Sequence, residues 1–239
     1  MPSSVPSPTP PMAVLPAILA VAGRPHTLLL VEDSRFAAES VRLICRRAGL
    51  RLRRADTLET ARRHLRVYRP DAALVDLGLP DGSGLDLIAE LARYAPHRPR
   101  IVAVSGDAEG CGAALAAGAD AFCPKPFDMP KLLAALLGEG ATALPRLPGL
   151  RAEALTLAVE RNAGSDPMAL HDDLKRAHAL LVQRTDPGRV GYAGQFIGGI
   201  ARSLHDDALV VAADLARQRG QRRPLLAALQ ERMAAIPAI

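Results

Sequence analysis

The chain has 239 residues, of which 49% are hydrophobic and 3% aromatic, with no tryptophan. A formal net charge of +5 permits contact with nucleic acid but is too small to indicate it. Three cysteines without metal-ligand spacing indicate reduced thiols in a cytoplasmic protein, and no apolar run approaches the roughly 18 residues of a membrane span.

The N-terminal segment, residues 1–24, is rich in proline and serine and is predicted to be disordered, with Met12 as a second candidate start. Residues 25–138 then alternate short apolar runs with helical stretches. The apolar runs predict strands at residues 28–31, 50–54, 72–75, 101–104 and 121–123. Helices are predicted to begin near Ser34, Thr57, Gly84, Glu109 and Met129. This alternation predicts an α/β fold, a doubly wound parallel sheet that binds ligands beyond the carboxyl ends of its strands.

The C-terminal half has a different pattern. Residues 139–149 are predicted to be a linker, and residues 150–239 an all-α helical bundle. Asp186 precedes Pro187 and Gly188, which indicates a turn followed by a helix that begins at the proline. Apolar residues at helical spacing form three stripes: Leu170, Leu174, Ala177 and Leu181; Phe196, Ile200 and Leu204; Leu225, Leu229 and Met233.

Acidic residues follow two of the predicted strands. Glu32 and Asp33 come after the first strand and Asp76 after the third, so all three carboxylates meet at one edge of the sheet. They would repel one another unless a cation joined them. Mg²⁺ fits, because it prefers oxygen ligands and keeps waters that a phosphate can replace.

The fourth and fifth strands end in a hydroxyl and an amine. Ser105, followed by Gly106, can bond a phosphoryl oxygen, and Lys125 can reach the same space as a point charge. Each of these residues taken singly is more simply a turn residue, a helix cap or a solvated loop residue. The combination at successive strand ends is what indicates a phosphoryl-binding pocket.

The same residues carry a family resemblance. The motifs are VEDS from Val31, DLGLPDGSGLDLI from Asp76, VSG from Val104, AALAAGADAF from Ala113, and KPF from Lys125. On these motifs residues 28–137 resemble the CheY-like receiver domain of bacterial two-component response regulators. The resemblance implies a five-stranded, flavodoxin-like sheet with strand order 2-1-3-4-5.

The resemblance also implies site roles. Asp76 would accept a phosphoryl group from the phosphohistidine of a sensor histidine kinase or phosphotransfer protein. Its metal ligands would be Glu32, Asp33, Asp76 and the Gly78 carbonyl around Mg²⁺, with Ser105 and Lys125 contacting the phosphoryl group. The bond between Lys125 and Pro126 would be cis. Phe122, which stands where receivers often have tyrosine, would act with Ser105 as a switch based on packing, or would simply fill the core.

The helical half lacks the features of a DNA-reading domain. The predicted helix around Phe196 is apolar and rich in glycine, whereas a recognition helix needs exposed polar side chains. One basic cluster, formed by Arg217, Arg219, Arg222 and Arg223, is more simply a solvated helix end than a phosphate-binding patch.

Residues 173–215 resemble a degenerate histidine-phosphotransfer domain, with a plain helical bundle as an equal alternative. Gln195 stands at the phospho-accepting position of that family and Gly198 at its usual lysine. The domain would then have lost phosphotransfer, and His171, His178 and His205 would be surface residues. The stripe of Phe196, Ile197, Ile200 and Leu204 would either bind a partner or pack inside the bundle, with Gly198 and Gly199 allowing close approach.

These features predict a response regulator of a two-component phosphorelay, without an enzymatic output beyond its own phosphorylation and dephosphorylation. Its helical domain would bind a signalling protein or a second copy of the chain, and DNA and membranes are not expected partners. The alternative is a phosphorylation-gated DNA-binding regulator of atypical type. Because Gly78 has no side chain and Asp107 could orient a water, we also predict a short-lived phosphoryl group.

Overall fold

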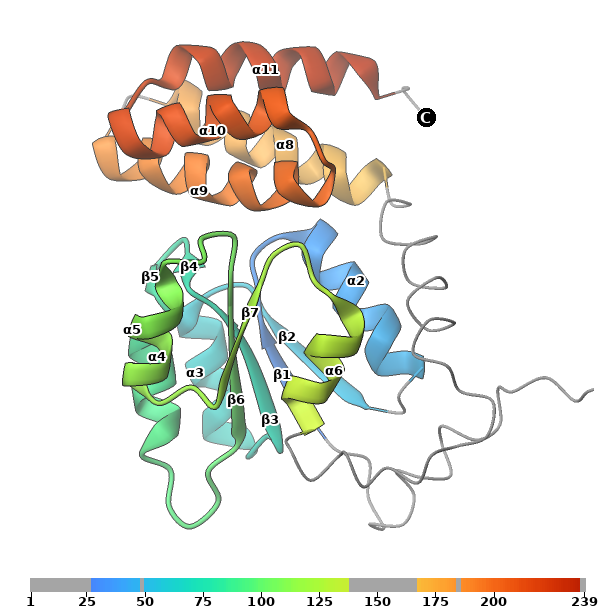
Figure 1. The fold of residues 1–239 in the computed structure, drawn as a ribbon, viewed down its shortest axis with the longest axis vertical. Helices are drawn as coiled ribbons and strands as arrows, with labels where there is room; N and C mark the ends of the chain where they lie inside the picture. The colour runs from blue at the N-terminus through green and yellow to red at the C-terminus, as the bar shows by residue number, and fades with distance from the viewer. Residues whose placement is uncertain (1–26, 48–49, 138–166, 184–185, 237–239) are drawn as a thin grey trace, which may run out of the picture.

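The computed structural model describes residues 27–47, 50–137, 167–183 and 186–236. These residues form an α/β domain and a helical domain that lies across one end of it (Figure 1). The predicted N-terminal segment, residues 1–24, and the predicted linker, residues 139–149, fall outside the described residues. None of the described helices has the length and hydrophobicity to cross a membrane.

The α/β domain is built on a parallel sheet. Five strands pair in the order β2-β1-β3-β6-β7, which confirms the predicted topology. Their bounds are β1 Thr27–Val31, β2 Arg51–Ala55, β3 Ala72–Asp76, β6 Arg100–Ser105 and β7 Ala121–Pro124. Each lies within a residue or two of the run that predicted it. The central strands are apolar on both faces, as buried parallel strands require, whereas the edge strand β2 keeps Arg51 and Arg53 exposed.

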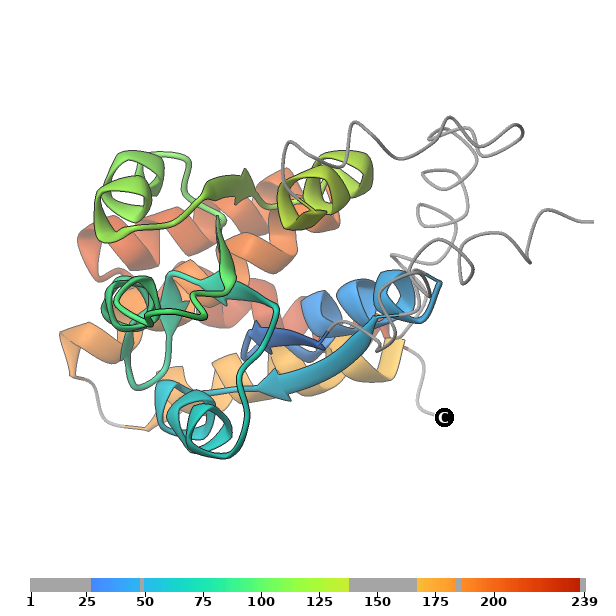
Figure 2. The same cartoon turned by 90° about the horizontal axis from the view of Figure 1, so that it is seen from below.

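Helices cover both faces of the sheet, as Figure 2 shows in end view. Alternate residues of β1 point to opposite faces. Leu29 packs with helices α3, α4 and α5, while Leu28 packs with α2 and α6. The helices have the bounds α2 Arg35–Arg47, α3 Leu58–Val67, α4 Gly84–Ala92, α5 Gly110–Ala117 and α6 Met129–Leu137. All five begin where the sequence predicted.

Four helices form the helical domain. They are α8 Pro167–Val182, α9 Pro187–Ser203, α10 Asp207–Arg219 and α11 Arg222–Ala235. Helix α9 begins at Pro187 with Asp186 as its N-cap, as predicted, and α10 ends at Gly220 in the left-handed conformation. Their core contains all three predicted stripes, with Met233, Leu170 and Leu204 only partly buried.

The two domains share part of one core. Phe36, on α2 of the α/β domain, is 6% exposed and belongs to the apolar cluster of the helical domain. The predicted stripe of Phe196, Ile197, Ile200 and Leu204 lies in the same cluster. Three of the four residues are therefore buried by packing within this chain and Leu204 is partly buried, so binding of a partner by the stripe stays a prediction.

Candidate functional site

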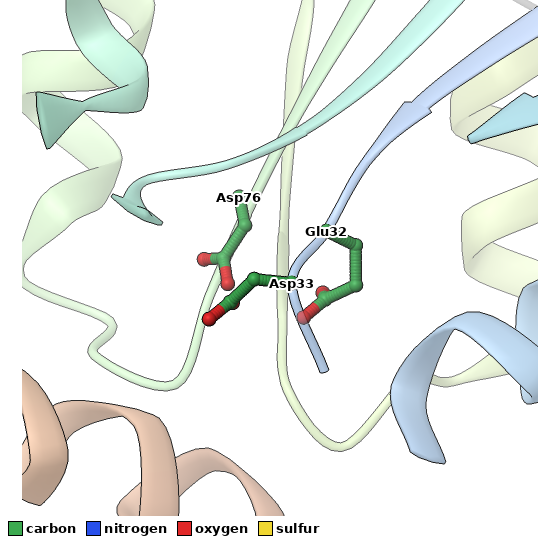
Figure 3. A group of neighbouring side chains, drawn as sticks. All are labelled: Glu32, Asp33 and Asp76. Carbon is green, nitrogen blue, oxygen red and sulfur yellow. The ribbon is translucent and has the colours of Figure 1, made fainter. Parts of the chain in front are cut away.

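Three carboxylates meet at the carboxyl edge of the sheet. Glu32 and Asp33 directly follow β1, and Asp76 is the last residue of β3. One oxygen of each lies within 4.8 Å of the others, and Figure 3 shows the three groups pointing toward one another. Their exposed fractions are 0%, 1% and 7%, so water screens little of their repulsion.

Lys125 supplies the counter-charge. It follows β7, and its Nζ donates hydrogen bonds to Glu32 Oε2 at 2.6 Å and to Asp76 Oδ2 at 2.8 Å. Burial by itself would lower the pKa of Lys125, but the two carboxylates outweigh burial and raise it. The lysine is therefore charged, and the acidic pocket, meaning Glu32, Asp33, Asp76 and Lys125, contains three carboxyl groups for one amine.

The donor set fits a divalent cation. Burial raises the pKa of Asp33 to about 6, and burial also raises the pKa of Glu32 against the attraction of Lys125. Asp33 Oδ1 is buried without a hydrogen-bond partner among the described residues. An unsatisfied carboxylate oxygen beside two further carboxylates is the arrangement that a hard, oxygen-binding cation such as Mg²⁺ stabilises.

The other predicted site residues lie around this pocket. Ser105 ends β6, one residue beyond the strand partner of Asp76, and its buried Oγ accepts a hydrogen bond from Asp107 N at 3.0 Å. The Gly78 amide donates to Asp76 Oδ1 at 3.2 Å. Phe122, on β7, is partly buried and packs on the core face of α3, α4 and α5. The peptide bond before Pro126 is cis, as predicted.

A sequence profile of the response regulator receiver domain matches residues 28–137. These residues are a response regulator receiver domain. The match ends before the helical domain, so the predicted resemblance of residues 173–215 to a histidine-phosphotransfer domain has no support from it.

Individual relatives agree with this assignment. The KDP operon transcriptional regulatory protein KdpE of Escherichia coli K12 is 32% identical over 122 residues, which are 49% of this chain and 54% of that protein. The transcriptional regulatory protein PhoP of Escherichia coli O157:H7 is 29% identical over 131 residues, 54% of this chain and 57% of its own length. The chain thus matches about half the length of these curated relatives.

Among solved structures, the CheY-like response regulator receiver domain from Methylobacillus flagellatus is 28% identical. The match includes 47% of this chain and 99% of that chain, with a TM-score of 0.42.

Helix α9 of the helical domain covers the acidic pocket of the receiver domain. Gln195, Gly199 and Ser203 are spaced four residues apart, so they lie on one face of the helix. That face lines a cavity of about 90 Å³ together with Asp76 and Lys125. The sequence did not predict this contact, because residue patterns report local structure and the two segments are far apart along the chain.

Gln195 takes the space beside Gly78. A Cβ at Gly78 would lie too close to the Gln195 amide, which is the end of a flexible side chain, so a larger residue at 78 would require that amide to move aside. The prediction that a phosphoryl group on Asp76 is unshielded beside Gly78 is therefore only partly right. Gly78 itself shields nothing, but a glutamine from the other domain fills the space that a side chain would have taken.

Two further side chains from the helical domain reach Asp33. The Tyr192 hydroxyl donates a hydrogen bond to Asp33 Oδ2, and the Arg176 Nη1 lies 3.4 Å from the same oxygen. Burial and the Asp33 carboxylate together raise the pKa of Tyr192, so the hydroxyl keeps its proton and remains a donor. The helical domain thus bonds directly to a predicted metal ligand.

Asp173 of α8 caps a helix of the other domain. Asp173 is 2% exposed, and its carboxylate accepts hydrogen bonds from Ser34 Oγ at 2.8 Å, Phe36 N at 3.1 Å and Arg35 N at 3.2 Å. The amides belong to the first turn of α2, whose N–H groups have no partner within the helix. One carboxylate therefore satisfies the helix end that begins directly after the acidic pocket.

The loop after β6 also contacts the helical domain. Arg217 Nη1 on α10 lies 2.6 Å from Asp107 Oδ2, and a Cβ on Gly106 would lie 3.3 Å from the Gly199 Cα. The tight position is therefore Gly106, whereas a Cβ at Gly199 would meet only Lys125 Cδ at an ordinary 3.8 Å, so the contact does not require glycine at 199. Asp107 Oδ1 also accepts from Glu109 N at 3.1 Å, and the water-orienting role of Asp107 stays a prediction.

Proposed function

We propose that this protein is a response regulator of a two-component phosphorelay that is phosphorylated on Asp76. The observation that carries the proposal is the position of Asp76 at the carboxyl edge of the sheet, 2.8 Å from Lys125 and beside two further buried carboxylates. The donor would be the phosphohistidine of a sensor histidine kinase or of a phosphotransfer protein. We propose no enzymatic output beyond the chain's own phosphorylation and dephosphorylation.

The chemistry follows from the arrangement of charges. A carboxylate oxygen of Asp76 attacks phosphorus, the bond from phosphorus to the imidazole nitrogen breaks, and its electron pair returns to the imidazole. Lys125 neutralises charge that spreads over the transferring oxygens. Glu32, Asp33, Asp76 and the Gly78 carbonyl would hold Mg²⁺, which supplies further electrostatic stabilisation of the same oxygens when bound.

Phosphorylation would be transmitted through Ser105 and Phe122. Ser105 stands one residue past the strand partner of Asp76, where its hydroxyl can turn toward a phosphoryl oxygen. Phe122 is on the neighbouring strand and pairs in register with Ala103. Its movement into space that Ser105 vacates would change the packing of β7 without requiring a hydroxyl at the surface.

The helical domain would be the output of this switch. The helical domain bonds to Asp33, to Asp107 and to the first turn of α2. A change in the acidic pocket therefore alters the contacts that hold the helical domain against the receiver domain. A phosphoryl donor must reach Asp76 through space that α9 lines, which requires the domains to separate. We propose that separation exposes a surface for a signalling protein or a second copy of the chain.

The position of Gln195 supports a degenerate phosphotransfer ancestry for the helical domain. The residue predicted to replace the phospho-accepting histidine is the one that lies over Gly78 and lines the acidic pocket. An amide cannot carry a phosphoryl group as imidazole does. We therefore expect no phosphohistidine on His171, His178 or His205, which acid-sensitive labelling of the phosphorylated protein would test.

Mass spectrometry tests the assignment of Asp76. The protein incubated with Mg²⁺ and acetyl phosphate should gain one phosphoryl group, and Asp76→Asn should gain none. Removing Mg²⁺ with a chelator should abolish labelling of the wild type. Equal labelling of the wild type and Asp76→Asn would overturn the proposal.

A DNA-binding regulator is the second candidate, because the relatives KdpE and PhoP are transcriptional regulatory proteins. The helical domain offers little support. Arg217 of its basic cluster pairs with Asp107, and Arg222 donates to the Leu181 carbonyl, so neither is free to bind phosphate. A gel shift with the phosphorylated protein at physiological salt should show weak binding without sequence preference. A specific footprint would favour this candidate.

A further inference from the structure

The cavity over Asp76 contains an amide without a partner. The polar side chains that line it are Glu32, Ser34, Ser40, Asp76, Lys125, Gln195 and Ser203. Glu32, Asp76 and Lys125 bond to one another, and each serine hydroxyl donates a hydrogen bond: Ser34 to Asp173, Ser40 to Phe36 O and Ser203 to Gly199 O. Within the described part of the chain, only the Gln195 amide in this lining makes no hydrogen bond.

The cavity has room for a reaction with water. A buried water needs about 10–15 Å³ of such space, and the cavity offers about 90 Å³. Gln195 lies beside Gly78, whose amide donates to Asp76 Oδ1, while Lys125 donates to Asp76 Oδ2. A water between the amide and a phosphoryl group on Asp76 would find a hydrogen-bond acceptor and a donor in one neutral side chain.

Contacts on both sides of Gln195 hold helix α9 over the pocket. One turn before Gln195, the Tyr192 hydroxyl donates to Asp33, and one turn after it, Gly199 lies against Gly106. The neighbouring residue Phe196 is 8% exposed and packs in the shared core. The backbone of Gln195 is therefore fixed over the pocket, so only the side-chain rotamer remains to be ordered when the amide orients a water.

A neutral amide suits hydrolysis better than transfer. Glutamine orients the attacking water in phosphoryl-transfer enzymes without itself becoming phosphorylated or charged. The other candidate for this role, Asp107, is a charged carboxylate that is paired with Arg217 and accepts from the Glu109 amide. A carboxylate in place of Gln195 would also repel the phosphoryl oxygens, whereas an amide does not.

We propose that Gln195 is a catalytic residue for dephosphorylation, which orients the water that hydrolyses the aspartyl phosphate of Asp76. The helical domain is then a built-in accelerator of signal decay. The water oxygen attacks phosphorus, the bond from phosphorus to the Asp76 oxygen breaks, and its electron pair restores the carboxylate. Both hydrogens of the water leave on the product, dihydrogen phosphate, and Gln195 is unchanged. The inference rests on the proposed phosphorylation of Asp76.

Decay of the phosphorylated full-length protein tests this role. Wild type, Gln195→Ala, Gln195→Met and the control Gln218→Ala are phosphorylated with acetyl phosphate and Mg²⁺, freed of the donor, and followed on phosphate-affinity gels. Gln218 is an exposed glutamine on α10, away from the cavity lining. We expect Gln195→Ala and Gln195→Met to decay roughly 10- to 100-fold more slowly than the wild type, and Gln218→Ala to match it.

The methionine variant separates chemistry from space filling. Methionine has nearly the length of glutamine but neither its donor nor its acceptor, so it preserves shielding and removes water orientation. If Gln195→Met decays like the wild type, or if Gln195→Ala decays faster, Gln195 shields the phosphoryl group and the inference is wrong. In denaturant, all four acyl phosphates should decay at one rate, because the fold no longer positions Gln195.

Failure of the proposed function gives a different result. If mass spectrometry finds no phosphoryl group on Asp76 in any of the four proteins, the assignment of Asp76 is wrong. If all four are labelled on Asp76 and decay at the same rate, Asp76 stands as the acceptor and the role of Gln195 is refuted.

Discussion

At the scale of single residues, Lys125 balances two buried carboxylates. Its Nζ bonds Glu32 and Asp76 at 2.6 and 2.8 Å, and its side chain is only 9% exposed. Breaking a buried ion pair by removing one partner costs more than the pair contributes, because the remaining charges keep their desolvation penalty without compensation. Lys125 therefore affects both stability and chemistry.

We expect Lys125→Met to destabilise the receiver domain by about 3 kcal/mol in the absence of Mg²⁺, and to slow phosphorylation by acetyl phosphate about 100-fold. Urea denaturation and mass spectrometry measure the two effects. Lys131→Met is the matched control, since its side chain is 81% exposed and its ion pair with Asp128 contributes little. Stability equal to the wild type would show that the carboxyl groups do not depend on the lysine.

Residue patterns predicted only part of this site. Asp76 and Ser105 end strands and Lys125 directly follows one, and parallel strands bring their carboxyl ends together, so topology alone predicts that they meet. Tyr192 and Asp173 could not be found in this way. Their partners lie 159 and 139 residues away along the chain, and only the packing of two domains brings them into contact.

At the scale of elements, α2 depends on another domain for its N-terminal cap. Its first turn uses both Ser34, whose Oγ accepts from Ala37 N at 3.0 Å, and Asp173 on α8. The amides of a first turn carry partial positive charge and offset part of the cost of burying the carboxylate, although burial still raises the pKa of Asp173. The capping carboxylate couples the end of one helix to the docking of another.

Asp173→Ala should lower the stability of this junction by about 1–2 kcal/mol, the usual effect of losing a helix cap. Amide hydrogen exchange at Arg35 and Phe36 is the direct measurement, and both should exchange faster. Asp172→Ala, at the adjacent residue, removes only an exposed pair with Arg35 and should leave Phe36 unchanged. Similar exchange in both variants would mean that Asp173 is not the cap in solution.

Helices α9 and α10 approach each other closely at one glycine. A Cβ on Gly194 would lie 2.5 Å from the Ala213 carbonyl oxygen and 2.7 Å from the Arg217 amide nitrogen. Both neighbours are backbone atoms and cannot turn away. The Gly191 position is different, because a Cβ there would meet the Arg217 carbonyl at an ordinary 3.9 Å.

The two glycines should therefore respond in opposite ways to alanine. Gly194→Ala should destabilise the helical domain by about 1–3 kcal/mol through overpacking. Gly191→Ala should stabilise it by about 0.5–1 kcal/mol, because alanine favours the helix interior. Thermal unfolding followed by circular dichroism compares them, and two shifts of the same sign would argue against the close helix contact.

The pattern of alternating elements predicted nearly all of the α/β fold but missed shorter or weaker features. Strands β4 Gly78–Leu79 and β5 Gly82–Ser83 pair over two residues each, which is too short for a periodic signal. The buried face of α10 consists largely of alanines, Ala212, Ala213 and Ala216, beside Leu209. Small side chains give a weak hydrophobic stripe, although they are what allows α9 to come close.

At the scale of the whole molecule, docking and phosphorylation are linked. The acidic pocket lies beneath α9, and in the proposed function a protein donor reaches Asp76 when the helical domain moves away. A change that weakens docking therefore raises the fraction of molecules in which Asp76 is accessible, and with it the rate of phosphorylation. Linkage is reciprocal, so a phosphoryl group that disfavours docking weakens the domain interface by the same free energy.

Reversing one charge in the interface tests this linkage. Arg217→Glu replaces an ion pair with repulsion at Asp107 and should raise the initial rate of phosphorylation by acetyl phosphate about fivefold. Asp107→Arg should have the same direction of effect, and the two substitutions together should restore the rate of the wild type. If the combined variant is as fast as either single one, the pair does not control access to Asp76.

The cavity above Asp76 has walls from two domains, so Asp76 has two different environments, one with the helical domain undocked and one with it docked. While the helical domain is away, the acceptor is open to a donor but lacks the amide of Gln195. Once the domain returns, input stops and the stored phosphoryl group is consumed. A signalling pathway that uses this protein would keep little phosphorylated protein between stimuli. The size of its response would depend on the fraction of molecules that are undocked when a donor arrives.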